Sequence, residues 1–253
     1  MGHIRQTFSS RTTRVLGLST ALAATAALLQ VHLGHRPAPP FAHPSYPLLA
    51  LVAGFAVAEC MVVHLEFRRE VHSISMSELP LVIGLVLFPP GELLAARLLG
   101  AAIALVIHRR QVGVKLVFNL TNFALEATLA ATIYRGLLGD HAVFSVVGGA
   151  SALIGTLSAN LVCGGAVIAA VSIHERRVQR DMFAPVMGAV AVSCVANTTL
   201  ALVAAAVVVH EPVAAWALLG LLGFAFLGFR SHAALRKRYE GLELLYGFTR
   251  RIG

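Results

Sequence analysis

The fold of this chain is decided by residues 92–134, where ELLAARLLGAAIALVIHRR (92–110) is followed directly by QVGVKLVFNLTNFALEATLAATIY (111–134). Each segment is apolar and long enough to cross a bilayer as a helix, at about 20 residues per crossing. The turn between them carries Arg109, Arg110 and Lys115, and basic turns of this kind stay on the cytoplasmic side of a membrane. The stretch therefore predicts a helical hairpin inside a membrane.

The composition of the whole chain predicts the same class. It is 57% hydrophobic and only 13% charged, whereas soluble domains carry about 25% charged residues. The basic residues recur at the ends of apolar runs, so the expected partner is the lipid bilayer and no nucleic acid is expected. Cys60, Cys163 and Cys194 each lie inside an apolar run, which predicts small buried side chains without disulfides.

Apolar runs recur along the chain and predict an all-α, polytopic helical bundle with about eight transmembrane helices. The expected segments are 15–33, 46–65, 74–88, 92–107, 116–134, 143–173, 183–209 and 213–229. The run before the first segment is polar and basic, and no small-residue cleavage site follows, so we expect an uncleaved first helix. The third segment is short and meets Pro89-Pro90-Gly91, a helix stop, so it either spans at a tilt or is a re-entrant half-helix.

The distribution of lysine and arginine orients the bundle. With eight crossings and a cytoplasmic N-terminus, every lysine and arginine falls on the inner side except Arg36, Arg135 and the embedded Arg97. A bias this one-sided follows the positive-inside rule. It predicts a multi-pass protein with both ends in the cytoplasm.

The last residues, 230–253, differ in character from the rest, so the expected domains are a membrane-embedded region, 1–229, and a cytoplasmic linker, 230–253. The linker is charged and favours a helix, and apolar residues recur in it at heptad-like spacing: Leu235, Leu242, Leu245 and Ile252. Such a seam predicts a signalling helix that pairs with its copy in a homodimer. The alternative is a basic helix lying on anionic headgroups.

Two stretches resemble a known family. HLEFRREVHSISMSELPLVIGLVLFPPGELLAARLLG (64–100), with HRRQ (108–111) and KLVFNLTNFALEA (115–127), resembles the N-terminal membrane-associated sensor (MASE-type) region of bacterial signalling proteins. In that family a multi-span domain precedes GGDEF and EAL domains, which make and degrade cyclic di-GMP. LELLYGFTRRIG (242–253) resembles the signalling helix that leads into a GAF, PAS or GGDEF domain. The resemblance implies the bacterial cytoplasmic (inner) membrane, and a cytoplasmic output domain beyond these residues.

Polar residues inside the apolar segments are the candidate binding residues. On the fifth segment Asn119, Asn122 and Glu126 are spaced i, i+3, i+7 and share one helix face. A carboxylate near mid-bilayer is costly and should face the bundle interior. The same polar core is expected to include Glu59, Arg97, Asn160 and Asn197. These residues either form a pocket for a small ligand or hold the helices together through hydrogen bonds.

The depths of two charges in the hairpin predict an ion pair. Arg97 lies about 7 Å below the outer end of its helix, and Glu126 about 12 Å below the outer end of the next, at 1.5 Å per residue. A short turn makes the two helices neighbours, so pairing would relieve both charges. The alternative is that Arg97 extends to the outer headgroups while Glu126 is protonated or bonded to the asparagines.

No catalytic motif is present. The sequence lacks a P-loop, a nucleophile elbow and paired catalytic carboxylates, so we expect no enzyme activity and no cofactor. His64, Glu66, Glu70 and His72 have no metal-site spacing, and we expect no metal there. The leading expectation is a sensory or anchoring domain that relays a signal to a cytoplasmic output domain. The alternatives are a small-solute transporter or membrane substrate-binding subunit, and an anchor that only dimerises.

Overall fold

The structure, a computed structural model, describes residues 2–35, 41, 47–61, 63–67, 70–74, 76–175, 180–214, 216–217, 220 and 223. It divides into two compact units, Met1–Ala205 and Ala206–Gly253. The predicted domain boundary at 229/230 and the signalling residues Leu235, Leu242, Leu245 and Ile252 lie outside the described residues.

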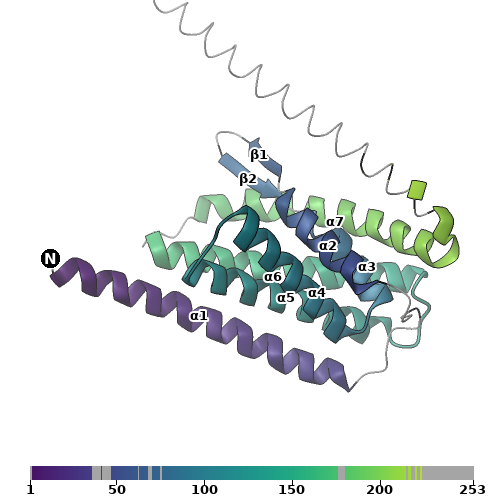
Figure 1. The fold of residues 1–253 in the computed structure, drawn as a ribbon, viewed down its shortest axis with the longest axis horizontal. Coiled ribbons are helices and arrows are strands. Elements are labelled where there is room, and N and C mark those ends of the chain that lie inside the picture. Colours follow the sequence, from purple (N-terminus) through teal and green to yellow (C-terminus); the bar gives the residue numbers. More distant parts are fainter. Residues whose placement is uncertain are drawn as a thin grey trace, which may run out of the picture. The chain divides into compact units, whose positions relative to one another are not determined.

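Nearly all the described elements are helices (Figure 1). The α-helices are α1 (Gly2–Gly34), α2 (Leu48–Cys60), α3 (Glu78–Leu87), α4 (Pro90–Ile103), α5 (Val114–Leu138), α6 (Val146–Glu175) and α7 (Arg180–His210). A π-helix, η1 (Ala104–His108), continues α4, and a 3-10 helix, η2 (Pro212–Ala214), follows α7. The exception to the predicted all-α fold is an antiparallel hairpin of β1 (Val63–Phe67) and β2 (Glu70–Ile74).

Five helices are long and apolar enough to cross a membrane, by length and composition: Thr12–Gly34, Pro90–His108, Val114–Leu138, Val146–Ile173 and Val190–His210. They coincide with the first, fourth, fifth, sixth and seventh predicted segments. Their large apolar side chains are widely exposed, as for Leu28 at 72% and Ile107 at 71%. This is the pattern of a membrane protein, in which lipid rather than water surrounds the helices.

The second and third predicted segments are shorter than expected. The predicted helix 46–65 is helical only over Leu48–Cys60, because residues from Val63 onward form β1. The predicted helix 74–88 is helical only over Glu78–Leu87. At 1.5 Å per residue these helices measure about 20 and 15 Å, less than the hydrocarbon thickness of about 30 Å. The eighth predicted segment, 213–229, falls largely outside the described residues.

Prolines separate α3 from α4. Phe88, directly before Pro89, is extended with φ −124° and ψ 149°, as expected for a residue that precedes proline. Pro90 then occupies the first position of α4, where its missing N–H leaves no hydrogen bond unmade. The two prolines therefore end α3 and begin α4 without a long loop between them.

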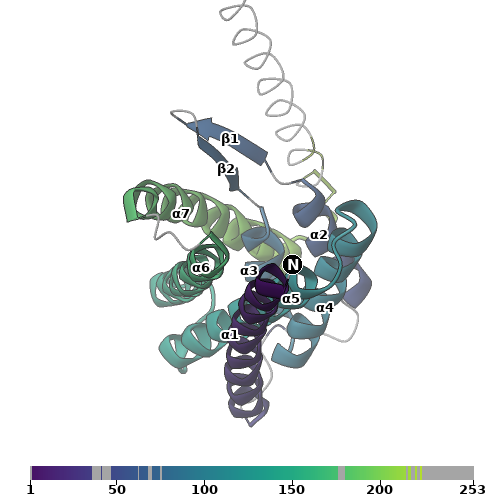
Figure 2. The ribbon, with the colours of Figure 1, turned by 90° about the vertical axis from the view of Figure 1, so that its left-hand side faces the viewer.

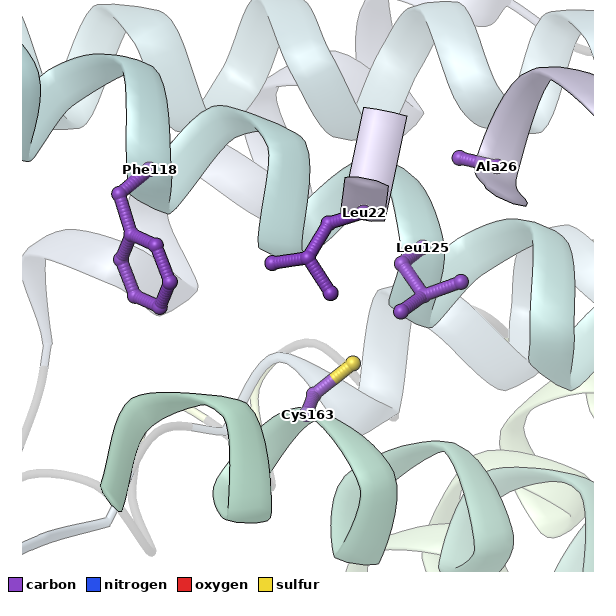
Figure 3. Close-up of a cluster of buried hydrophobic side chains, with 5 residues drawn as sticks. All are labelled: Leu22, Ala26, Phe118, Leu125 and Cys163. Atoms are coloured by element: carbon purple, nitrogen blue, oxygen red, sulfur yellow. The ribbon is translucent and has the colours of Figure 1, made fainter. Parts of the chain in front are cut away.

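Within the first unit, α5 packs closely against α6 and α1, while α2 packs against α4. Figure 2 looks along the bundle and shows α1, α5 and α6 side by side. A buried apolar cluster joins these three helices through Leu22, Ala26, Phe118, Leu125 and Cys163 (Figure 3). This cluster is an apolar contact between α1, α5 and α6.

Small residues bring the helices together elsewhere. A Cβ atom on Gly100 of α4 would lie 2.6 Å from both Phe55 Cβ and Val52 O of α2. Glycine at this position lets the two backbones approach, as is common between helices in membranes. The close approach of α2 and α4 determines which polar groups meet in the interior.

Candidate functional site: a buried ionic chain and a carboxylate held by two asparagines

Arg97 is the centre of the polar interior. It projects from α4 with 1% of its side chain exposed and pairs with two carboxylates. Its Nη2 lies 2.6 Å, and its Nε 3.1 Å, from Glu126 Oε2 of α5. Its Nη1 lies 2.9 Å from Glu59 Oε1 of α2. The ion pair predicted between Arg97 and Glu126 is confirmed, and Arg97 does not extend to the headgroups.

Two aromatic rings cover the Arg97 guanidinium. Its Cζ lies 4.0 Å from the centre of the Phe123 ring and 5.0 Å from that of Phe55, which adds cation–π attraction to the ion pairs. Phe123 precedes Glu126 by three residues, and Phe55 precedes Glu59 by four. Because residues three and four apart share a helix face, α5 and α2 each present one carboxylate and one ring to the same guanidinium.

The ionic contacts continue to the basic turn. Arg109 follows η1, and its Nη2 donates a hydrogen bond of 2.7 Å to the backbone oxygen of Glu59. The same nitrogen lies 3.8 Å from Glu59 Oε2, and the Arg109 side chain is 32% exposed. We call the series Arg109–Glu59–Arg97–Glu126 the ionic chain. It connects the α4–α5 turn with the interior of the bundle.

A second polar cluster lies between α3, α6 and α7. Glu78, in the first turn of α3, is 6% exposed. Asn197 Nδ2 of α7 donates to its Oε2 at 3.0 Å, and Asn160 Nδ2 of α6 to its Oε1 at 3.4 Å. Asn160 Nδ2 also lies 3.5 Å from the Cys194 sulfur. These hydrogen bonds join three helices that are far apart in the sequence.

Buried hydroxyl groups extend this cluster along α6 and α7. The hydroxyl oxygens of Thr156 and Thr198 lie 3.0 Å apart, and each also contacts the Cys194 sulfur, at 3.5 and 3.9 Å. Thr156 also donates to the Ala152 carbonyl of its own helix. A polar seam therefore runs between two otherwise apolar helices, with Glu78 near one end.

The predicted polar core is divided by the structure. Glu59, Arg97 and Glu126 meet in the ionic chain, whereas Asn160 and Asn197 meet at Glu78 instead. The remaining two predicted residues do neither. Asn119 donates a 2.7 Å hydrogen bond to Gln111 near the start of α5. Asn122 is 6% exposed, and within the described part of the chain its Oδ1 has no hydrogen-bond partner.

Sequence reasoning missed Glu78, Arg109 and the two rings. Glu78 stands at the beginning of an apolar run, a position that suggests a solvated helix end. One signal could have found the rings. A phenylalanine precedes a glutamate by about one turn at Phe55 and Glu59 and again at Phe123 and Glu126, and this repeat indicates that α2 and α5 present similar faces to Arg97.

The described residues contain no group of three or more His, Cys, Asp or Glu side chains placed to hold a metal ion. Comparison with protein-family models, with curated proteins and with solved structures gives no match for this chain. The site contains two buried carboxylates paired with a buried arginine, and these charges are linked to the α4–α5 turn through Arg109.

Proposed function

We propose that this chain is a membrane sensory and anchoring domain that relays a signal to a cytoplasmic output domain. The ionic chain is the observation that carries this proposal. It leads from Glu126, inside the bundle, through Arg97 and Glu59 to Arg109 in the basic turn. A change at the buried end can therefore alter the position of the α4–α5 turn, because each link shares a side chain with the next.

The proposal includes the finer topology. Eight crossings with both ends in the cytoplasm place the basic turn on the inner side of a bacterial cytoplasmic membrane. In Figure 1 the start of α1 and the turn before α5 lie toward the same, left-hand end of the first unit, which supports this orientation. The two short helices, α2 and α3, account for the second and third crossings.

The output is proposed from the sequence of residues 230–253. Their heptad-like spacing and their resemblance to signalling helices support a homodimer through this segment and an output of the cyclic di-GMP type. A shift of the bundle would then pass to a paired helix with two alternative registers.

The test joins a GGDEF cyclase domain after Gly253 and measures cyclic di-GMP in cells. Arg109→Gln should change the output by about threefold or more, because it removes the last link of the ionic chain. Arg110→Gln is the matched control, since it removes the same charge from the same turn, and no hydrogen bond or ion pair of Arg110 is described. Equal outputs from the two variants, at equal amounts of membrane-inserted protein, would contradict the relay.

A small-solute transporter is the second candidate function. It is favoured by the short α3, which ends at Leu87 just before the two prolines and carries the buried Glu78 at its start, since transporters place binding sites at interrupted helices. Solute uptake into vesicles that contain the purified chain, with no effect of Arg109→Gln on an attached cyclase, would favour this candidate.

A further inference from the structure

The ionic chain has no net charge, whereas the buried Glu78 has no ion pair among the described residues. Arg109 and Arg97 carry two positive charges, and Glu59 and Glu126 carry two negative charges. Glu78 is as buried as Glu126, yet the ion pairs of the described residues do not include it. An isolated ionised carboxylate inside a membrane bundle is costly. Glu78 therefore needs a cationic partner that none of the described side chains supplies.

The charged and titratable groups near Glu78 do not supply a cationic partner for it. Glu126 on α5 and Arg97 on α4 act on it electrostatically, and their effects oppose each other. The other buried titratable side chains on the described parts of the helices around it are Glu59 on α2, Tyr134 on α5, Cys163 on α6 and Cys194 on α7. None of these is a cation, and the direct contacts come from the neutral amides of Asn160 and Asn197 and from a neutral backbone N–H.

The amides of Asn160 and Asn197 can form hydrogen bonds with both the ionised and the protonated form of the Glu78 carboxyl group. An ionised carboxylate only accepts hydrogen bonds, and both asparagines donate to it through Nδ2. A protonated carboxyl group also donates one, and an asparagine can accept it through Oδ1 after a half-turn of its amide. A metal cation would instead require oxygen ligands, whereas the amide nitrogens face Glu78.

We infer that Glu78, held between Asn160 and Asn197, is a proton-binding site inside the membrane bundle. Proton uptake there neutralises a buried charge that has no ion pair among the described residues. It also reorients an amide, and Asn160 contacts both Glu78 and Cys194, so the packing of α3 on α6 and α7 changes with it. The site does not depend on the signalling function proposed above; where that function holds, the proton is a stimulus that the domain conveys.

Infrared difference spectra of the full chain in lipid vesicles test the site directly, because they record the C=O stretch of protonated carboxyl groups. The pH is stepped upward from about 5, above the range in which exposed glutamates titrate. The wild type should lose a carboxylic band during the titration, and Glu78→Gln should lack that band. Glu92→Gln, at an exposed position in the first turn of α4, should retain it. An unchanged band in Glu78→Gln would overturn the inference.

A second variant keeps the test decisive if Glu78→Gln fails to insert. Asn197→Ala removes one donor to the ionised carboxylate, so the midpoint of the band should move toward higher pH by about one unit. Thr199→Ala, at an exposed position on the same helix whose hydroxyl donates to the Val195 carbonyl, should leave the midpoint in place. Equal midpoints in these two variants would overturn the inference.

The ions in the buffer separate a proton from a metal cation. The titration is repeated with sodium replaced by choline. The same midpoint in both buffers is expected for a proton site. A midpoint that moves with sodium concentration would show that a metal cation competes for Glu78 and would overturn the assignment to a proton.

Discussion

Arg97 forms ion pairs with two carboxylates, and the two carboxylates differ in how many hydrogen bonds they receive from it. Glu126 receives both the Nε and the Nη2 hydrogen of Arg97, whereas Glu59 receives one from Nη1 and is also contacted by Arg109. Loss of Arg97 leaves Glu126 without an ion pair among the described residues. Loss of Glu126 leaves Arg97 still paired with Glu59.

This inequality gives the first prediction. Arg97→Ala should destabilise the bundle by about 3–5 kcal/mol, because it leaves buried charge uncompensated. Glu126→Ala should cost less, since Arg97 keeps Glu59. The double variant should lose much less than the sum of the two single losses. Unfolding in detergent micelles or bicelles measures all three.

A control for these variants is Leu99→Ala, two residues away on α4, where the side chain is 55% exposed. It should have little effect on unfolding. Additive losses in the double variant would mean that the Arg97 and Glu126 side chains do not interact.

At the scale of elements, the contact between α2 and α4 decides whether the ionic chain can form. Glu59 and Phe55 belong to α2, a helix of only 13 residues, and they reach Arg97 because Gly100 permits a close approach. The π-helix η1 then leads to the turn, where Arg110 has a positive φ of 48°. This geometry places the neighbouring Arg109 against the last turn of α2, where a cation is favourable.

The second prediction concerns this contact. Gly100→Ala should destabilise the protein by about 1–3 kcal/mol, because the added methyl group meets the α2 backbone and must push the helices apart. Gly136→Ala on α5 is the matched control, since an added Cβ there meets nothing within 4 Å. It should be neutral or slightly stabilising, as alanine favours helix more than glycine does. Thermal unfolding of the two purified variants distinguishes them, and equal melting temperatures would contradict the close α2–α4 contact.

At the scale of the whole molecule, the question is how many times the chain crosses the membrane. Five helices meet the length for a crossing, and α2 and α3 are shorter. The hairpin β1–β2 joins these two short helices. If α2 and α3 both cross the membrane, the β1–β2 hairpin lies on the cytoplasmic side. If neither helix crosses it, the hairpin lies on the external side.

Reporter fusions give the third prediction. Reporters placed after Arg110, after Arg180, after Gly253 and between β1 and β2 should read cytoplasmic, because the basic residues gather there. Reporters near His43, Asp140 and His210 should read external. An external reading between β1 and β2 would remove the second and third crossings, and an external reading after Gly253 would contradict the proposed relay to a cytoplasmic output.

The sequence by itself predicted the membrane class, placed the five long helices among its eight segments, and offered the pairing of Arg97 with Glu126 as one of two alternatives. These follow from local quantities: apolar length, positions of basic residues, and depth along a helix of constant rise. The ends of α2 and α3 were not predicted, because the pairing of β1 with β2 takes up residues at the ends of both predicted segments, and strand pairing is not visible in local hydropathy.

Only the tertiary structure decided which polar groups meet across distant helices. Glu59 joins Arg97, and Asn160 and Asn197 converge on Glu78 rather than on Glu126. The physical reason is that helices in lipid are apolar on every side, so their periodicity does not reveal which face points inward. The rotation of each helix is set instead by close contacts such as that of Gly100 with Val52 and Phe55. Those contacts arise only when the bundle is assembled.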